Sequence, residues 1–134
     1  MWTTDHSVET DVSADAIWRA WADVDGWPRW NADIERIELR GPFDTGGTIA
    51  MTPRGQETVE LTIAEAVDGE RFVDEADVGG TVVRTMHRIE PLGNGRSRVT
   101  YRLEATGPAE AEIGPAVSSD FDDTLAALVD YARG

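Results

Sequence analysis

The feature that most constrains the fold is a run of alternating apolar and polar residues between Gly46 and Gly107, broken at short intervals by turn-forming residues. Gly, Asn and Asp tolerate the positive φ angles of tight hairpins. The turn sites are Pro53–Gly55, Asp68-Gly69, Gly79-Gly80 and Gly93–Gly95. We expect strands over residues 48–52, 57–67, 71–78, 81–90 and 97–106. Successive side chains of a strand point to opposite faces, so the pattern predicts an antiparallel meander with one buried face.

The N-terminal third predicts one more strand, two short helices and a further strand. Residues 2–12 alternate as a half-buried strand does. Ser13 is placed as the N-cap of a helix over 14–22, which we expect Gly26 to stop. Residues 27–30 are typical of a second short helix with Pro28 at an early position, and residues 34–39 of a strand.

The C-terminal segment 108–133 predicts a long amphipathic helix, interrupted or first started at Gly114-Pro115. Its apolar side is formed by Ile113, Val117, Phe121, Leu125, Leu128 and Ala132. Residues 1–134 therefore predict a single α+β domain, in which a curved antiparallel sheet of about seven strands wraps around this helix. Such a helix does not fill the hollow of a bent sheet, so we expect a cavity between them.

The amino-acid composition limits which classes of molecule can be partners of this chain. The 134 residues and 14.6 kDa suit one domain. Twelve basic residues, all Arg, stand against 26 acidic ones, and the net charge of −14 excludes nucleic acid as a favoured partner. The chain has no cysteine, no export signal at its start and no apolar run long enough for membrane insertion. We expect a cytoplasmic protein, a monomer or weak homodimer.

Several segments together resemble a known family. They are Ile17–Asp23, Trp27–Asn31, His87–Pro91 and Arg98–Tyr101, followed by Gly107 and a closing helix with Leu125 and Leu128. In order and spacing the chain resembles the polyketide cyclase/dehydrase-like branch of the START-related helix-grip superfamily (SRPBCC). The resemblance implies a cavity for a polyketide, lipid or other hydrophobic or aromatic molecule, usually without metal or organic cofactor. Members differ in activity, so the resemblance selects no single reaction.

Two histidines are the candidates for chemistry near neutral pH. His6 and His87 both fall on the inward alternation of their strands. If the first strand pairs with the last, the two lie on one face, two strands apart. We predict that His87 acts as a general base or hydrogen-bond donor in a cofactor-free cyclase or dehydratase step; the alternative is a half-buried structural histidine. Two histidines without a third ligand do not indicate a zinc site.

Tyr101 is the second catalytic candidate, because its hydroxyl can donate to a developing enolate oxygen; the alternative is a core tyrosine. Trp30 lies where a cavity mouth is expected. The predicted pocket residues are His6, Val8, Trp30, Ile49, Met51, Leu61, Ile63, Phe72, Thr85, His87, Val99, Tyr101, Phe121 and Leu125.

Charged residues of the meander are interpreted as surface. Glu65, Asp74 and Glu75 fall where strand parity is ambiguous, and we expect them in solvent. The arginines 84, 88, 98 and 102 are expected on the outer face, paired with Glu60, Glu90 and Glu104. The function class that competes with ligand binding is a protein-interaction module, which presents its sheet or helix to a partner protein.

Overall fold

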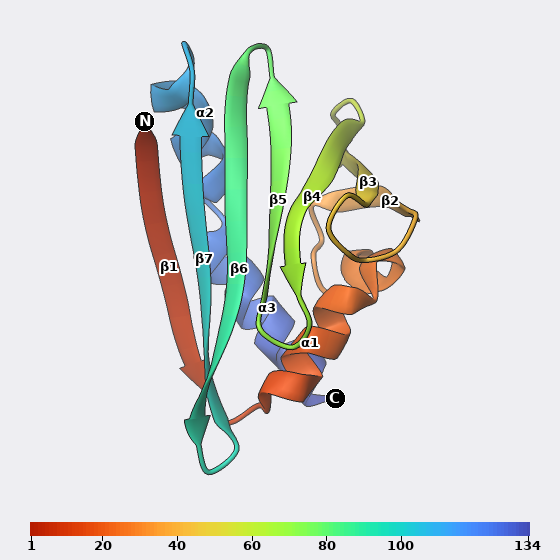
Figure 1. Cartoon of the computed structure of the whole chain (residues 1–134), viewed down its shortest axis with the longest axis vertical. Helices are drawn as coiled ribbons and strands as arrows, with labels where there is room; N and C mark the ends of the chain where they lie inside the picture. Colours follow the sequence, from red (N-terminus) through yellow and green to blue (C-terminus); the bar gives the residue numbers. More distant parts are fainter.

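One antiparallel sheet of seven strands forms the body of the molecule (Figure 1). The computed structural model describes residues 1–134. The strands are β1 Trp2–Thr10, β2 Ile34–Arg40, β3 Thr48–Pro53, β4 Val59–Val67, β5 Arg71–Val78, β6 Thr81–Gly93 and β7 Arg96–Thr106. Their order across the sheet is β1-β7-β6-β5-β4-β3-β2, so the first strand pairs with the last as expected.

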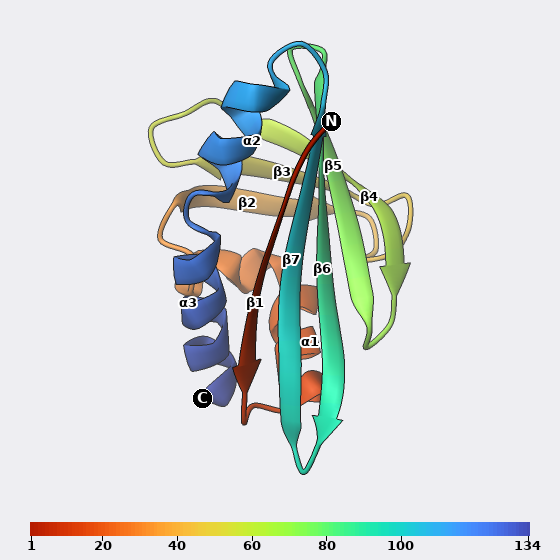
Figure 2. The same ribbon diagram turned by 90° about the vertical axis from the view of Figure 1, so that its left-hand side faces the viewer.

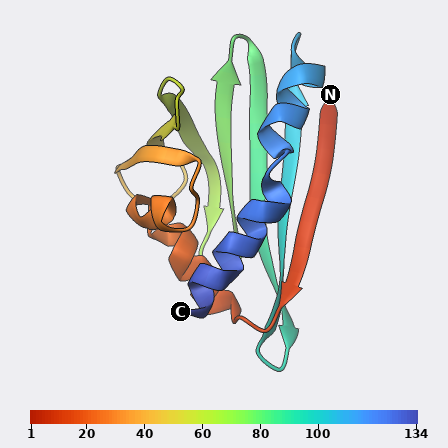
Figure 3. The ribbon, with the colours of Figure 1, turned by 180° about the vertical axis from the view of Figure 1, so that it is seen from behind.

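Helices cover one face of this sheet, which we call the inner face. They are α1 Ala14–Ala22, the 3-10 helix η1 Val24–Arg29, α2 Glu110–Ser118 and α3 Phe121–Arg133. Figure 2 shows the sheet bent, with β2 and β3 running across the direction of β6 and β7. Seen from behind, α2 and α3 lie along the inner face (Figure 3). The curved sheet that wraps around the C-terminal helical segment is therefore confirmed.

The hairpin and capping chemistry of the sequence forms as predicted. Where β6 turns into β7, residues 93–95 all have positive φ, with Asn94 at 55°. Such angles strain most side chains but suit Gly and Asn. Ser13 caps α1 by accepting a hydrogen bond from the Ala16 amide at 3.3 Å.

The second short helix differs from the prediction. It is a 3-10 helix over Val24–Arg29, and Pro28 lies near its end rather than its start. Gly26 lies inside it, while α1 already ends at Ala22. Gly26 therefore does not end α1.

The C-terminal helix is interrupted, but at Ser119-Asp120 and not at Gly114-Pro115. Gly114 is required because a Cβ there would overlap the indole ring of Trp2 on β1. The Ser118 hydroxyl donates to the Gly114 carbonyl at 2.9 Å near the end of α2. The break starts α3 at Phe121, whose ring packs on Tyr101 of β7, with ring centroids 5.4 Å apart.

The core lies between the inner face and the helices. Its fully buried side chains include Ile17 and Trp21 of α1, Phe72 of β5, and Leu125 and Leu128 of α3. Each such burial contributes roughly 1.5–3 kcal/mol. Trp21 packs α1 against β5, β6 and β7, whereas α3 lies against α1, β1 and, through Phe121, β7. The inner positions of these strands also carry polar groups.

Candidate functional site

Polar side chains lie in two adjacent rows at the centre of the inner face. In the first row, Asp74 of β5 stands opposite Thr85 of β6. In the second, His87 of β6 stands opposite Tyr101 of β7, and Tyr101 stands opposite His6 of β1. The prediction that His6 and His87 share a face, two strands apart, is confirmed.

Aromatic rings surround the second row. The His87 imidazole stacks on the Phe72 ring, with centroids 3.9 Å apart and planes 7° apart. The Tyr101 ring meets His87 edge-on at 4.6 Å. Trp21 of α1 covers both, and its indole Nε1–H donates to the Tyr101 hydroxyl oxygen at 3.3 Å. This hydrogen bond uses the hydroxyl as acceptor and leaves its proton available for another group.

His87 is buried and neutral. Desolvation lowers its pKa to about 3, and hydrogen bonds to the backbone of Phe72 and Thr85 offset this only in part. The Nδ1 atom lies 3.4 Å from the Phe72 carbonyl oxygen, so the tautomer that bonds there donates from Nδ1. An imidazole with so low a pKa is a weak base at neutral pH. Because the Nδ1–H is donated to Phe72, the neutral imidazole offers a ligand only Nε2 as an acceptor, so this geometry favours neither the donor nor the general-base role, and the part His87 takes in chemistry stays a prediction.

Asp74 was expected in solvent, and that expectation is wrong. Its side chain lies on the inner face with 8% of the residue exposed. The register of β4 against β5 shifts between Ile63 and Glu65, which made the parity of this region ambiguous. Alternation within β5 alone, with Phe72 and Ala76 both buried, was the signal that places Asp74 inside.

Burial, and to a smaller extent the charge of Glu75, raises the pKa of Asp74 to about 7. A carboxyl group that titrates near neutral pH can both accept and return a proton. Glu75 and Glu65 lie on the outer face as expected, paired with Arg84 and Arg71. Asp74 is therefore the acid–base candidate that the sequence did not identify.

His6 and Tyr101 differ in burial. His6 lies at the edge of the inner face, half-buried, with Nδ1 2.9 Å from the Asp122 carboxylate of α3. Tyr101 is 3% exposed, and desolvation raises the pKa of its phenol. Of the two, only Tyr101 lies within the central aromatic cluster.

The other predicted pocket residues all take inward positions. The half-buried ones are Val8, Trp30 and Met51, and the rest are buried. The indole Nε1 of Trp30 is buried without a hydrogen-bond partner, which is costly unless a further group approaches it. Most of these side chains pack in one core cluster, so their contact with a ligand stays a prediction.

A hollow of about 270 Å³ opens at the edge of this cluster, between the end of α1 and β4. It is lined by Trp18, Ala22, Phe43, Asp44, Ala66 and Asp68. None of these was among the predicted pocket residues; Phe43 and Asp44 in particular lie in a loop without strand or helix periodicity. The Phe43 ring lies 5.1 Å from Phe72, centroid to centroid, and so joins the hollow to the ring on which His87 stacks.

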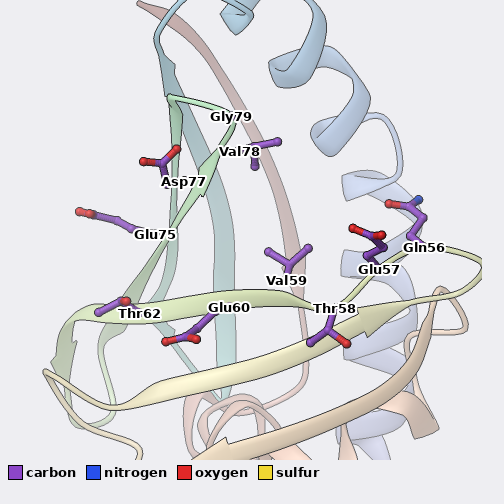
Figure 4. A pocket seen from close by; sticks show the side chains of 10 residues that line it. All are labelled: Gln56, Glu57, Thr58, Val59, Glu60, Thr62, Glu75, Asp77, Val78 and Gly79. Atoms are coloured by element: carbon purple, nitrogen blue, oxygen red, sulfur yellow. The ribbon is translucent and has the colours of Figure 1, made fainter.

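A second, more open hollow of about 790 Å³ lies where β4 and β5 separate (Figure 4). The last cross-strand pair between them is Thr62 with Glu75. Beyond it the walls carry Glu57, Glu60 and Asp77 as well as Val59. The groove is polar and exposed, in contrast to the aromatic hollow beside Phe43.

Two further features bear on the class of site. No three His, Asp or Glu side chains gather in an arrangement that would hold a metal ion. None of the helices has the length and apolar composition of a membrane span.

Of the four outer-face arginines, Arg84, Arg98 and Arg102 are paired across strands as expected, although mostly with other partners, whereas Arg88 forms no ion pair. Arg98 bonds Glu9 at 3.0 Å, Arg102 bonds Asp5 at 3.1 Å, and Arg84 bonds Glu75. Of the predicted partners, Glu104 lies within 4.0 Å of Arg102. These pairs explain the arginines as outer-face residues, separate from the polar rows on the other side of the sheet.

A bent antiparallel sheet that closes on a C-terminal helix defines the helix-grip class of proteins. A family model described as "Polyketide cyclase / dehydrase and lipid transport" matches residues 1–133, and the chain belongs to that family. The expected family resemblance is thus confirmed. A search of curated proteins finds no match.

Solved structures share the fold at low sequence identity. A START superfamily protein from Mycobacterium smegmatis is 18% identical, with a TM-score of 0.76 over 98% of this chain and 97% of that one. A hypothetical protein from Helicobacter pylori is 17% identical, with a TM-score of 0.82 over 98% and 88%. The ZhuI aromatase/cyclase from Streptomyces sp. R1128 is 16% identical, with a TM-score of 0.75 over 98% and 93%.

Proposed function

We propose that this protein binds a small hydrophobic or aromatic molecule on the inner face of its sheet, reached through the hollow beside Phe43. The observation that carries the proposal is the pair of adjacent polar rows on the inner face, Asp74 with Thr85 and His87 with Tyr101, of which the second is surrounded by aromatic rings. Membership of a family described by cyclase, dehydrase and lipid-transport functions supports it.

Burying polar groups is unfavourable unless they gain partners, and a core that only stabilises the fold does better with apolar side chains. Ligand sites, in contrast, have apolar walls with a few polar groups that fix orientation. The hollow supplies aromatic walls, and its 270 Å³ is close to the lower end of the roughly 300–1,000 Å³ typical of such sites. The side chains of the polar rows would then form hydrogen bonds with the polar end of the ligand.

The same arrangement supports a second candidate, cofactor-free proton transfer on an enolisable ligand. The Asp74 carboxylate would remove a proton from the carbon next to a carbonyl group, and the Tyr101 O–H would donate a hydrogen bond to the enolate oxygen that forms. Return of the proton from Asp74 to carbon or to a leaving hydroxyl completes an isomerisation or a dehydration. The pKa of Asp74, raised to about 7, suits both directions.

Binding is tested with N-phenyl-1-naphthylamine, a neutral probe whose fluorescence rises in apolar surroundings. We expect saturable binding to one site per chain. Ala22→Phe fills the hollow and should weaken binding at least about tenfold, whereas Ala126→Phe on the exposed side of α3 should not. Absence of saturable binding, or equal effects of the two variants, would contradict the proposed site.

Proton transfer is tested by deuterium exchange at C1 of 2-tetralone, an enolisable aromatic ketone, followed by NMR. The wild type should accelerate exchange over buffer. Asp74→Asn should abolish the acceleration while 2-tetralone still binds. Equal exchange in both proteins would limit the function to binding.

A further inference from the structure

We propose that the molecule bound at this site is an organic cation, namely a hydrophobic compound with one protonated amine, and that Asp74 is its counter-charge. This inference rests on the proposed function, since it specifies the ligand class of the same site. The inference rests on the charged side chains on the inner face and at the hollow, which are all carboxylates.

Asp74 has no cationic partner in the protein. It is more than nine-tenths buried on the inner face, and none of the ion pairs or side-chain hydrogen bonds of the structure involves its carboxyl group. Along β5, β6 and β7 the arginines alternate onto the outer face, where they pair with acidic residues such as Glu65 and Glu75. A buried carboxylate without a counter-ion is unfavourable, and a bound ammonium group would remove that penalty.

The hollow beside Phe43 also carries negative charge without a basic residue, here next to aromatic rings. Two aromatic side chains, Trp18 and Phe43, stand with two carboxylates, Asp44 and Asp68, and no basic residue lines it. Asp44 also accepts a hydrogen bond from the Thr45 amide at 2.7 Å, which leaves its second oxygen free of that contact. Aromatic faces and carboxylates both attract ammonium groups.

The net charge of the whole chain also favours a cationic ligand. A net charge of −14 concentrates cations near the surface and repels anions. A ligand with a carboxylate would bring a second negative charge toward Asp74. An alcohol of the same shape would keep the apolar contacts but lose the charge pairing, so we expect the order amine, alcohol, carboxylate in affinity.

The test uses three ligands with one naphthyl body: 2-(1-naphthyl)ethylamine, 2-(1-naphthyl)ethanol and 1-naphthylacetate. Affinities are measured by isothermal titration calorimetry at low salt and about pH 8, where the amine is still protonated and Asp74 is mostly ionised. The wild type should bind the amine at least about tenfold more tightly than the alcohol, and the carboxylate most weakly.

Asp74→Asn keeps the shape of the side chain and removes its charge. It should bring the affinities for amine and alcohol to within about threefold of each other. Asp130→Asn on the exposed side of α3 removes one negative charge elsewhere and should keep the preference. The wild-type comparison of the three ligands is decisive even if a variant does not fold.

Three results would overturn the inference. If amine and alcohol bind the wild type equally, the ligand class is wrong. If Asp74→Asn keeps the preference for the amine, Asp74 is not the counter-charge. In both cases binding of the alcohol still supports the proposed function. If none of the three ligands binds, the proposed function fails together with the inference.

Discussion

Replacing Asp74 by asparagine should stabilise the protein, by an amount that depends on pH. The carboxyl group is on the inner face of β5, and burial raises its pKa from 3.8 to about 7. The folded state therefore holds this proton more tightly than the unfolded chain does. The stability that protonation supplies is fully present below about pH 4 and is lost as pH rises through about 7.

The size of the effect follows from the two pKa values. One pKa unit corresponds to about 1.36 kcal/mol, so the whole shift corresponds to about 4 kcal/mol. Asparagine has the shape of the protonated acid and does not titrate. Between about pH 5 and pH 8 the free energy of unfolding of Asp74→Asn, relative to wild type, should therefore rise by about 3 kcal/mol.

Urea denaturation followed by tryptophan fluorescence measures this difference at several pH values. Measurements begin near pH 5 because the isoelectric point near 4.3 favours association below it. Asp130→Asn, at an exposed position, controls for removal of one negative charge and should give a pH-independent difference. A pH-independent difference for Asp74→Asn as well, or a loss of stability at pH 8, would refute the assignment of a buried, titrating carboxyl group.

Three other predictions follow from named contacts. The ¹³Cε1 shift of His87 should show no inflection between about pH 8 and 5, because burial lowers its pKa to about 3; an inflection in that range would restore the general-base role. Gly114→Ala should lower the free energy of unfolding by roughly 1–3 kcal/mol in urea titrations, because the new methyl group overlaps Trp2; an unchanged stability would contradict the close packing of α2 on β1. Asp33→Asn should lower the pKa of Asp120 from about 6, though not to its usual value, because desolvation is the largest cause and Asp33 the second; carboxyl ¹³C NMR titration measures it, and an unchanged pKa would show that the two carboxyl groups do not interact.

The sheet was predictable because the sequence features that specify it, alternation and turn residues, lie within short segments of the chain. Alternation over residues 81–106 sets which side chains face inward, and the Gly93–Gly95 turn fixes the register of that hairpin. Pairing of β1 with β7 then placed His6, Tyr101 and His87 in one row, as the structure shows. Ser13 likewise fixed the start of α1 by a contact only three residues long.

The features that sequence reasoning missed depend on tertiary contacts. A register shift in β4 obscured the parity of the neighbouring strand and hid Asp74. Phe43 lies in a loop, where no periodicity shows that it packs on Phe72. Burial, which the sequence pattern signals only indirectly, lowers the pKa of His87 and raises that of Asp74, which is why the sequence did not single out Asp74 as an acid–base candidate.

The most direct test of the account locates a bound molecule on the protein. In the complex with 2-(1-naphthyl)ethylamine, intermolecular NOEs from the naphthyl protons identify the side chains in contact. We predict NOEs to the ring protons of Phe43 and Phe72, and from the ligand methylene next to nitrogen to the Hβ protons of Asp74. NOEs confined to Val59 and Val78 in the groove between β4 and β5, or none to the inner face, would contradict the claim that this face holds the ligand.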